Sequence, residues 1–276
     1  MKTKHTADIL DIPITTLNQK EVIEFIIKRL KSNKKTFLTT PNPEILLESQ
    51  KNAKLKNILM QTDLNTPDGI GLLWADNFLL KTKNTNSKLY LVFYGIISVL
   101  LTPWINKNKL RIKEVVTGTD LMNEICTSGI FNDYKFFFLG GQSDEADSAK
   151  KTLQNINKKL KVVGTSNDDP TNENSVDQIN ESEAEILFVA YGCPKQEIWI
   201  YDNLSKLKHI KFVIGIGGAF NFLSGKISRA PRFIRKLGLE WLYRLFKEPL
   251  KRSKRIFNAV IVFPYQIIKS RVQKSN

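Results

Sequence analysis

Short, almost unbroken apolar runs alternate along the chain with longer segments in which apolar residues recur every three or four positions. The first pattern is typical of strands buried on both faces, and the second is typical of amphipathic helices. Strands are predicted at residues 8–17, 35–40, 63–66, 134–139, 160–164, 186–190 and 212–216. Helices are predicted at residues 20–32, 44–60, 71–80, 120–126, 144–158 and from 195 onward. This alternation predicts an α/β fold, a parallel, doubly wound sheet flanked by helices.

Residues 81–111 depart from this alternation. They contain the 17-residue run LYLVFYGIISVLLTPWI, which is flanked by basic residues and falls at or below the lower limit for a spanning helix. The run is therefore either a membrane-dipping or interfacial segment, or a buried or partner-facing helix. The basic flanks and the aromatic ends, Tyr90 and Trp104, favour membrane contact.

The C-terminal segment is helical in pattern and strongly basic. Of the formal net charge of +15, residues 226–276 carry +12. Apolar residues at 241–246 share one helical face with basic residues around them, which indicates either an interfacial amphipathic helix or a helix docked on the domain with a solvated rim. We therefore expect two parts: a core at 1–230, with an apolar insertion at 81–111, and a basic, membrane-associating appendage at 231–276.

The composition excludes several classes of function. The N-terminus lacks the apolar stretch of a secretory signal, so a reducing cytoplasm is the expected compartment. The two cysteines, Cys126 and Cys193, give neither a disulfide framework nor zinc spacing. His5 and His209 stand alone, which argues against a histidine-based nucleophile and a histidine-ligated metal. The basic charge fits nucleic acid, an anionic membrane or a phosphorylated substrate.

Polar turns follow several predicted strands. The turn Gly192–Glu197 follows the strand at 186–190, and Gly217-Gly218 follows the strand at 212–216. In open α/β sheets ligands bind outside the carboxyl ends of strands, so both turns are candidates for a site, although ordinary strand-to-helix turns explain them equally well. Gly140-Gly141 between a strand and a helix has the form of a phosphate site or of a simple tight turn.

Six motifs in order along the chain resemble the WecG/TagA/CpsF glycosyltransferase family. They are TPNPE at 40–44, PDGIG at 67–71, TGTDL at 117–121, FLGG at 138–141, GCPKQE at 192–197 and EWLYR at 240–244. The resemblance implies inverting, metal-independent transfer of a sugar from a UDP-sugar to a polyprenyl-diphosphate-linked saccharide, in teichoic-acid, capsule or exopolysaccharide synthesis. It implies a Rossmann-like core, no cofactor, and an appendage that closes over the site at the membrane. The donor sugar is then of the ManNAc type, a uronic-acid derivative or glucose.

The resemblance also implies roles for particular residues. Asp68 matches the general base, and a carboxylate in a partly enclosed turn suits that task, although Pro-Asp-Gly is also a common turn sequence. Thr40 and Asn42 would bind the donor sugar or orient the acceptor, and Gln196 would contact sugar hydroxyls, with Glu197 structural. The nucleotide cleft and the leaving group would be bound by Gly140, Gly141, Gly217, Gly218, Arg244, Lys251, Arg252, Lys254 and Arg255.

The sequence departs from the family pattern in three places. Val115 stands where an arginine is usual before the TGTD motif, and Arg111 is the nearest candidate to replace it. Asn221 replaces an aspartate in FNFLSG, where we still expect a substrate contact. The segment 81–111 is longer than usual, which fits extra membrane contact.

The expected partners are a UDP-sugar, a polyprenyl-diphosphate-linked acceptor and the inner face of the cytoplasmic membrane, and a homo-oligomer is compatible with the sequence. The alternative is a basic module on an α/β scaffold that binds anionic membranes or nucleic acid. Nucleic acid is disfavoured because the basic residues of the tail are interleaved with large apolar ones. A nucleotide-dependent oxidoreductase lacks its GxGxxG fingerprint here.

Overall fold

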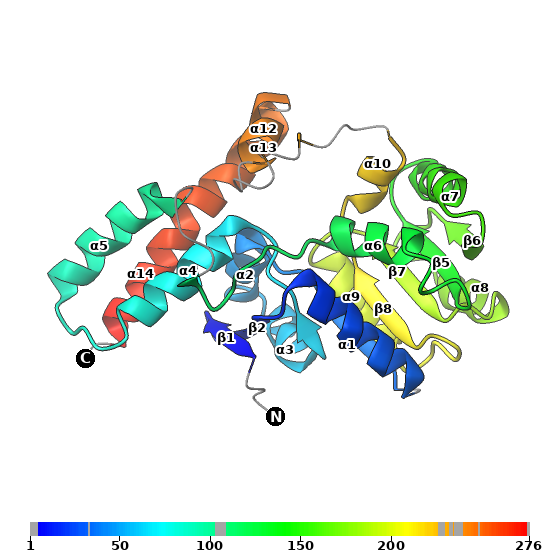
Figure 1. Ribbon diagram of the computed structural model, residues 1–276, viewed down its shortest axis with the longest axis horizontal. Helices are drawn as coiled ribbons and strands as arrows, with labels where there is room; N and C mark the ends of the chain where they lie inside the picture. The colour runs from blue at the N-terminus through cyan, green and yellow to red at the C-terminus, as the bar shows by residue number, and fades with distance from the viewer. Residues whose placement is uncertain are drawn as a thin grey trace.

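The computed structural model describes residues 5–32, 34–102, 109–225, 230–231, 234, 240–247 and 249–274; at 241, 244, 247 and 249–252 it describes the backbone alone. Its centre is a six-stranded sheet in the order β4-β3-β8-β7-β5-β6, in which every neighbouring pair is parallel (Figure 1). The strands are β3 (Thr36–Thr39), β4 (Leu64–Asn65), β5 (Lys135–Gly140), β6 (Lys161–Ser166), β7 (Ile186–Ala190) and β8 (Phe212–Gly215). The predicted α/β class is confirmed.

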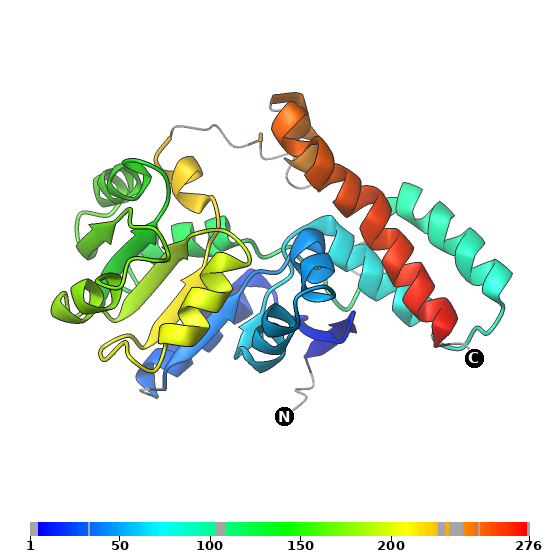
Figure 2. The same ribbon diagram turned by 180° about the vertical axis from the view of Figure 1, so that it is seen from behind.

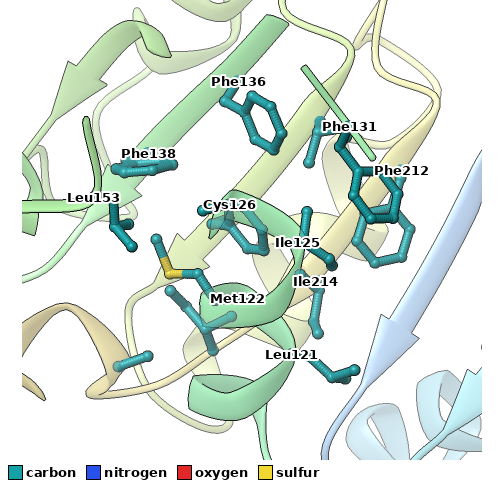
Figure 3. Packing of buried hydrophobic residues seen from close by; sticks show 14 of the residues in the cluster. Leu121, Met122, Ile125, Cys126, Phe131, Phe136, Phe138, Leu153, Phe212 and Ile214 are labelled. Atoms are coloured by element: carbon teal, nitrogen blue, oxygen red, sulfur yellow. The ribbon is translucent and has the colours of Figure 1, made fainter. Parts of the chain in front are cut away.

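Helices cover both faces of this sheet because its strands are apolar on both sides. One face packs on α1 (Gln19–Lys31), α6 (Gly118–Thr127), α7 (Glu145–Ile156) and α10 (Ala219–Leu223). The other packs on α3 (Ala53–Gln61), α8 (Ser175–Glu181) and α9 (Lys195–Asn203). Along β5, Phe136 and Phe138 point to the first face and Phe137 to the second. Figure 3 shows Phe136 and Phe138 around the buried side of α6.

A second core lies beside the sheet. It joins a two-stranded antiparallel hairpin, β1 (Thr6–Ile9) and β2 (Ile12–Thr15), to α2 (Pro43–Ser49), α4 (Ile70–Lys81) and α14 (Phe263–Gln273). Trp74, Phe78, Phe263 and Ile267 are almost completely buried in it. Helix α5 (Lys88–Leu100) packs on α4 and α14 at the outer side (Figures 1 and 2).

The C-terminal segment is helical, as predicted: α12 (Glu240–Lys247), α13 (Pro249–Phe257), the π-helical turn η3 (Asn258–Val262) and then α14. Its last helix completes the second core, since Phe263 and Ile267 are fully buried. The expected boundary at residue 230 adjoins residues outside the described ranges and stays a prediction. Within the described ranges no helix is both long and apolar enough to cross a bilayer.

Two predicted elements are wrong. Residues 8–17 form a hairpin instead of one strand, because Leu10 and Asp11 both adopt positive φ angles, 53° and 67°, and reverse the chain. Residues 44–60 form two helices, because the Asn52 side chain accepts the N–H of Leu55 and starts α3 anew. Smaller shifts occur at helix starts. Asn18 caps α1 with Glu21 in a capping box, as its sequence allows, whereas α6 is capped by Thr117, two residues earlier than predicted.

Candidate active site

The sheet has a switch point between β3 and β8. These strands are neighbours, but the chain continues from β3 to α2 and α3 on one side of the sheet and from β8 to α10 on the other. A crevice at the carboxyl ends of the strands follows from this topology, and ligands of open α/β sheets bind in such crevices. A cavity of about 1660 Å³ lies there, walled by the turns after β3, β4, β7 and β8 and by residues of α13 and η3.

Three predicted residues, Thr40, Asn42 and Asp68, meet on the wall of this cavity. Their turns are tied together through the backbone, since the Asp68 N–H donates to the Pro41 carbonyl oxygen at 3.0 Å. The Asn42 side chain also accepts the N–H of Ile45 at 3.0 Å and thereby caps α2. Asn42 therefore has a structural task, and the predicted contacts of Thr40 and Asn42 with sugar stay predictions.

The start of helix α6 forms another part of the wall. Thr117, Gly118 and Thr119 line the cavity. The Thr117 hydroxyl accepts the N–H of Asp120 at 3.0 Å and donates to the Asp120 carboxylate at 2.7 Å. Unpaired backbone N–H groups and the helix dipole make such a start favourable for a negatively charged group. The sequence predicts a helix start at this motif, as Thr-Gly-Thr-Asp before an apolar run indicates, but sequence reasoning gave the motif no role in binding.

The side chain of Gln196 connects two turns of the wall. Its Oε1 accepts the N–H groups of Gly192 at 3.2 Å and Gly217 at 3.0 Å, and its Nε2 donates to Glu197 Oε1 at 2.8 Å. Glu197 is 1 % exposed, and this burial raises the pKa of its carboxyl group. Burial also raises the pKa of the neighbouring Cys193 thiol, so Cys193 is held in its unreactive form. The predicted contact of Gln196 with sugar hydroxyls stays a prediction.

The predicted glycines divide into two pairs. Gly217 and Gly218 line the cavity, whereas Gly140 and Gly141 are not among its lining residues. Gly140 has φ of +85°, and a Cβ there would lie 2.7 Å from the ring of Tyr191. Close packing at the end of β5 therefore accounts for Gly140 without a ligand, and a nucleotide contact by this pair stays a prediction.

The basic residues of the C-terminal segment are placed in part. Arg255 lines the cavity, and its Nε donates to Glu44 Oε2 at 2.6 Å, which ties α13 to α2 across the cavity. Lys254 is exposed and does not line it. The side chains of Arg244, Lys251 and Arg252 lie outside the described part of the chain.

The departures from the family pattern can also be placed. Asn221 and Val115 line the cavity. Arg111 does not replace the missing arginine at the wall, because its guanidinium pairs with the carboxylate of Asp76, which is 1 % exposed. Among the residues that the structure describes, no three His, Cys, Asp or Glu side chains come together as metal ligands would.

The fold and the cavity define a Rossmann-type α/β protein with a ligand site at the carboxyl edge of its sheet. The profile of the Glycosyl transferase WecG/TagA/CpsF family matches residues 7–92 and 83–276, so the chain belongs to this family. The two matches overlap at residues 83–92, around the start of α5, within the segment 81–111 that the sequence marks as an insertion. Family membership decides for a glycosyltransferase against a binding module on an inert scaffold.

Several curated proteins named N-acetylglucosaminyldiphosphoundecaprenol N-acetyl-beta-D-mannosaminyltransferase are similar to this chain. The protein from Bacillus subtilis strain 168 is 27 % identical over 91 % of this chain and 87 % of its own length. That from Staphylococcus aureus strain MRSA252 is 25 % identical over 96 % and 92 %, respectively. That from Bacillus spizizenii is 26 % identical over 80 % and 75 %, respectively.

Proposed function

We propose that this glycosyltransferase moves an N-acetylmannosamine-type sugar from a UDP-sugar to a polyprenyl-diphosphate-linked saccharide. The main support for this proposal is that Thr40, Asn42 and Asp68 lie with the start of α6 on the wall of one cavity, at the switch point between β3 and β8. The names of the relatives support the acceptor class, and among the three donor sugars that the sequence left open they favour the mannosamine type.

Asp68 is the general base of this proposal. Its carboxylate takes the proton of the acceptor hydroxyl while the hydroxyl oxygen forms a bond to the anomeric carbon of the donor sugar. The bond from that carbon to the diphosphate breaks in the same displacement, and its electron pair leaves with UDP. Attack from the face opposite the leaving group inverts the anomeric configuration.

The departing diphosphate needs compensation for its developing charge. The start of α6 and the guanidinium of Arg255 are two groups on the cavity wall suited to that task. Arg255 forms an ion pair with Glu44 on the facing helix. A bound diphosphate would therefore either take the place of the Glu44 carboxylate or share the Arg255 guanidinium with it. We propose that these groups make a metal ion unnecessary, and that retention of turnover in EDTA tests this.

The experiment for the base is Asp68→Asn, with transfer from UDP-N-acetylmannosamine to a lipid-linked acceptor as the readout. Turnover is expected to fall about 10²–10⁴-fold because the amide cannot accept the proton, while UDP binding measured by calorimetry stays close to that of the wild type. Asp133→Asn, an exposed carboxylate outside the cavity, is the control. Normal turnover of Asp68→Asn would remove Asp68 from the mechanism.

A further inference from the structure

Helix α5 presents a row of large apolar side chains to solvent. Leu89, Phe93 and Ile96 are 83, 65 and 56 % exposed, respectively, and they recur at the spacing of one helical face. Contiguous exposed apolar patches of this kind mark sites of interaction in soluble proteins. We call the following residues the α5 surface: Leu89, Tyr90, Val92, Phe93, Ile96, Ile97, Leu100 and Leu101.

The opposite side of α5 is firmly attached to the protein. Trp74 of α4 donates its indole N–H to Ser98 at 3.0 Å, in a buried position. Gly95 lets α14 approach closely, because a Cβ there would lie 2.5 Å from Ile268. The contacts of α5 with α4 and α14 therefore use the side of the helix opposite the α5 surface. The α5 surface itself is accessible to a partner outside the chain.

The segments around the α5 surface carry positive charge alone. Residues 77–113 contain seven Lys and Arg and no Asp or Glu, and residues 249–276 likewise contain seven and none. The two segments are far apart in sequence, but α14 packs alongside α5 (Figures 1 and 2). Three of these basic residues pair with carboxylates of other segments, Arg111 with Asp76, Arg255 with Glu44 and Lys274 with Asp11. An apolar face flanked by segments that carry an excess of basic residues is complementary to an anionic lipid surface.

We propose that the α5 surface docks on an anionic bilayer, with α5 lying in the plane of the interface. With 13 residues, α5 is roughly 20 Å long and too short to cross a hydrocarbon core of about 30 Å. A second copy of the chain fits less well, because a two-fold interface would bring the same basic segments face to face with no acidic residue of these segments to pair with them.

This orientation also gives the cavity an entrance from the lipid. Val99, Leu100 and Thr102, at the end of α5, line the same cavity as Asp68. Leu100 is both part of the α5 surface and part of the cavity wall. This part of the inference rests on the proposed function. Because the α5 surface and the cavity wall are continuous, a lipid-linked acceptor can keep its hydrocarbon chain in the bilayer while its sugar enters the cavity.

The test is co-sedimentation of the full chain with vesicles of phosphatidylcholine alone or mixed with phosphatidylglycerol, without substrate. The triple variant Leu89→Ser/Phe93→Ser/Ile96→Ser is expected to bind mixed vesicles at least about tenfold more weakly than the wild type. These three residues do not line the cavity. The matched control is Ile130→Ser/Ile156→Ser, whose side chains are 55 and 63 % exposed outside α5.

A second variant tests the charge. Replacing Lys81, Lys83 and Lys88, all exposed, with glutamine is expected to weaken binding to the mixed vesicles and to leave binding to phosphatidylcholine unchanged. Equal binding of the wild type to both vesicle types would refute the claim that the basic residues attract the α5 surface to anionic lipid.

Unchanged binding of the serine variant, or an equal loss in its control, would overturn the docking proposal. A change from dimer to monomer in the serine variant without loss of vesicle binding would assign the α5 surface to a second copy and would also overturn it. UDP binding of the same samples, measured without vesicles, bears on the proposed function alone, so the two failures are distinguishable. Retained UDP binding and an unchanged circular dichroism spectrum of the serine variant exclude misfolding as the cause of lost docking.

Discussion

Replacing Glu197 with glutamine is expected to stabilise the protein progressively relative to the wild type as the pH rises above 4.5, the ordinary pKa of a glutamic acid side chain. Burial raises the pKa of Glu197 in the folded state, so the folded protein keeps a proton that the unfolded chain releases. The wild type therefore loses stability with rising pH until the folded-state pKa is passed. Glutamine has nearly the same shape and does not ionise.

The structure sets the size of the effect. A single group of this kind changes the free energy of unfolding by at most about 1.4 kcal/mol per pH unit. Gln196 Nε2 donates to Glu197 Oε1 at 2.8 Å, and a glutamine oxygen can accept this bond equally well. Glu197→Ala, by contrast, leaves the buried Gln196 amide without that acceptor, which costs about 1–3 kcal/mol at every pH.

The assay is urea unfolding of the wild type and both variants between about pH 5 and 8. The stability difference between Glu197→Gln and the wild type should grow with pH, and Glu197→Ala should lie below Glu197→Gln throughout. Glu181→Gln, which removes an exposed carboxylate on α8, is the control. A constant difference between Glu197→Gln and the wild type would show that Glu197 is charged in the folded protein and would refute the argument.

Three further substitutions test contacts that support the site. Arg271 donates from one guanidinium nitrogen to three carbonyl oxygens in the turn after α4. Arg271→Met should therefore lower the free energy of unfolding by about 1.5–3 kcal/mol, and a loss no larger than that of Lys269→Met would contradict this. Asp76→Asn should cost about 1–3 kcal/mol, measured in urea, because it weakens the pairing of the half-exposed Arg111 with a carboxylate that is itself buried; equal stability would mean the pair contributes nothing. Gly215→Ala should weaken UDP binding in calorimetry, since its Cβ would lie 2.7 Å from the Gln196 side chain; unchanged affinity would exclude Gln196 from shaping the site.

Parts of the fold could be predicted because the deciding signal is local. The apolar runs of β7 and β8 leave little choice but buried strands, and Asn18 with Glu21 specifies the start of α1 within four residues. The hairpin of β1 and β2 gives no such signal. Its turn places Leu10 and Asp11 at positive φ, where glycine or asparagine would be expected. Packing of the hairpin in the second core stabilises this unfavourable turn conformation.

The candidate site follows the same division. Thr40 and Asp68 each follow a short parallel strand, so their meeting at the carboxyl edge of the sheet could be foreseen from topology. The ion pair of Arg255 with Glu44 joins residues more than two hundred positions apart, and no local pattern predicts it. The side chain of Gln196 likewise faces inward to two backbone N–H groups, which depends on how β7 and β8 are paired.

Helix α4 connects the proposed chemistry to the proposed membrane surface. It begins directly after Asp68-Gly69 at the cavity, and its 12 residues extend over roughly 18 Å. Arg271 donates a hydrogen bond to the turn that follows the C-terminal end of α4, and Trp74 in the middle of α4 donates one to Ser98 of α5. With the α5 surface on a bilayer, these contacts hold the Asp68 carboxylate at a fixed position relative to the lipid. A base that must meet the hydroxyl of a lipid-anchored sugar needs such a fixed position, because proton transfer requires approach within about 3 Å.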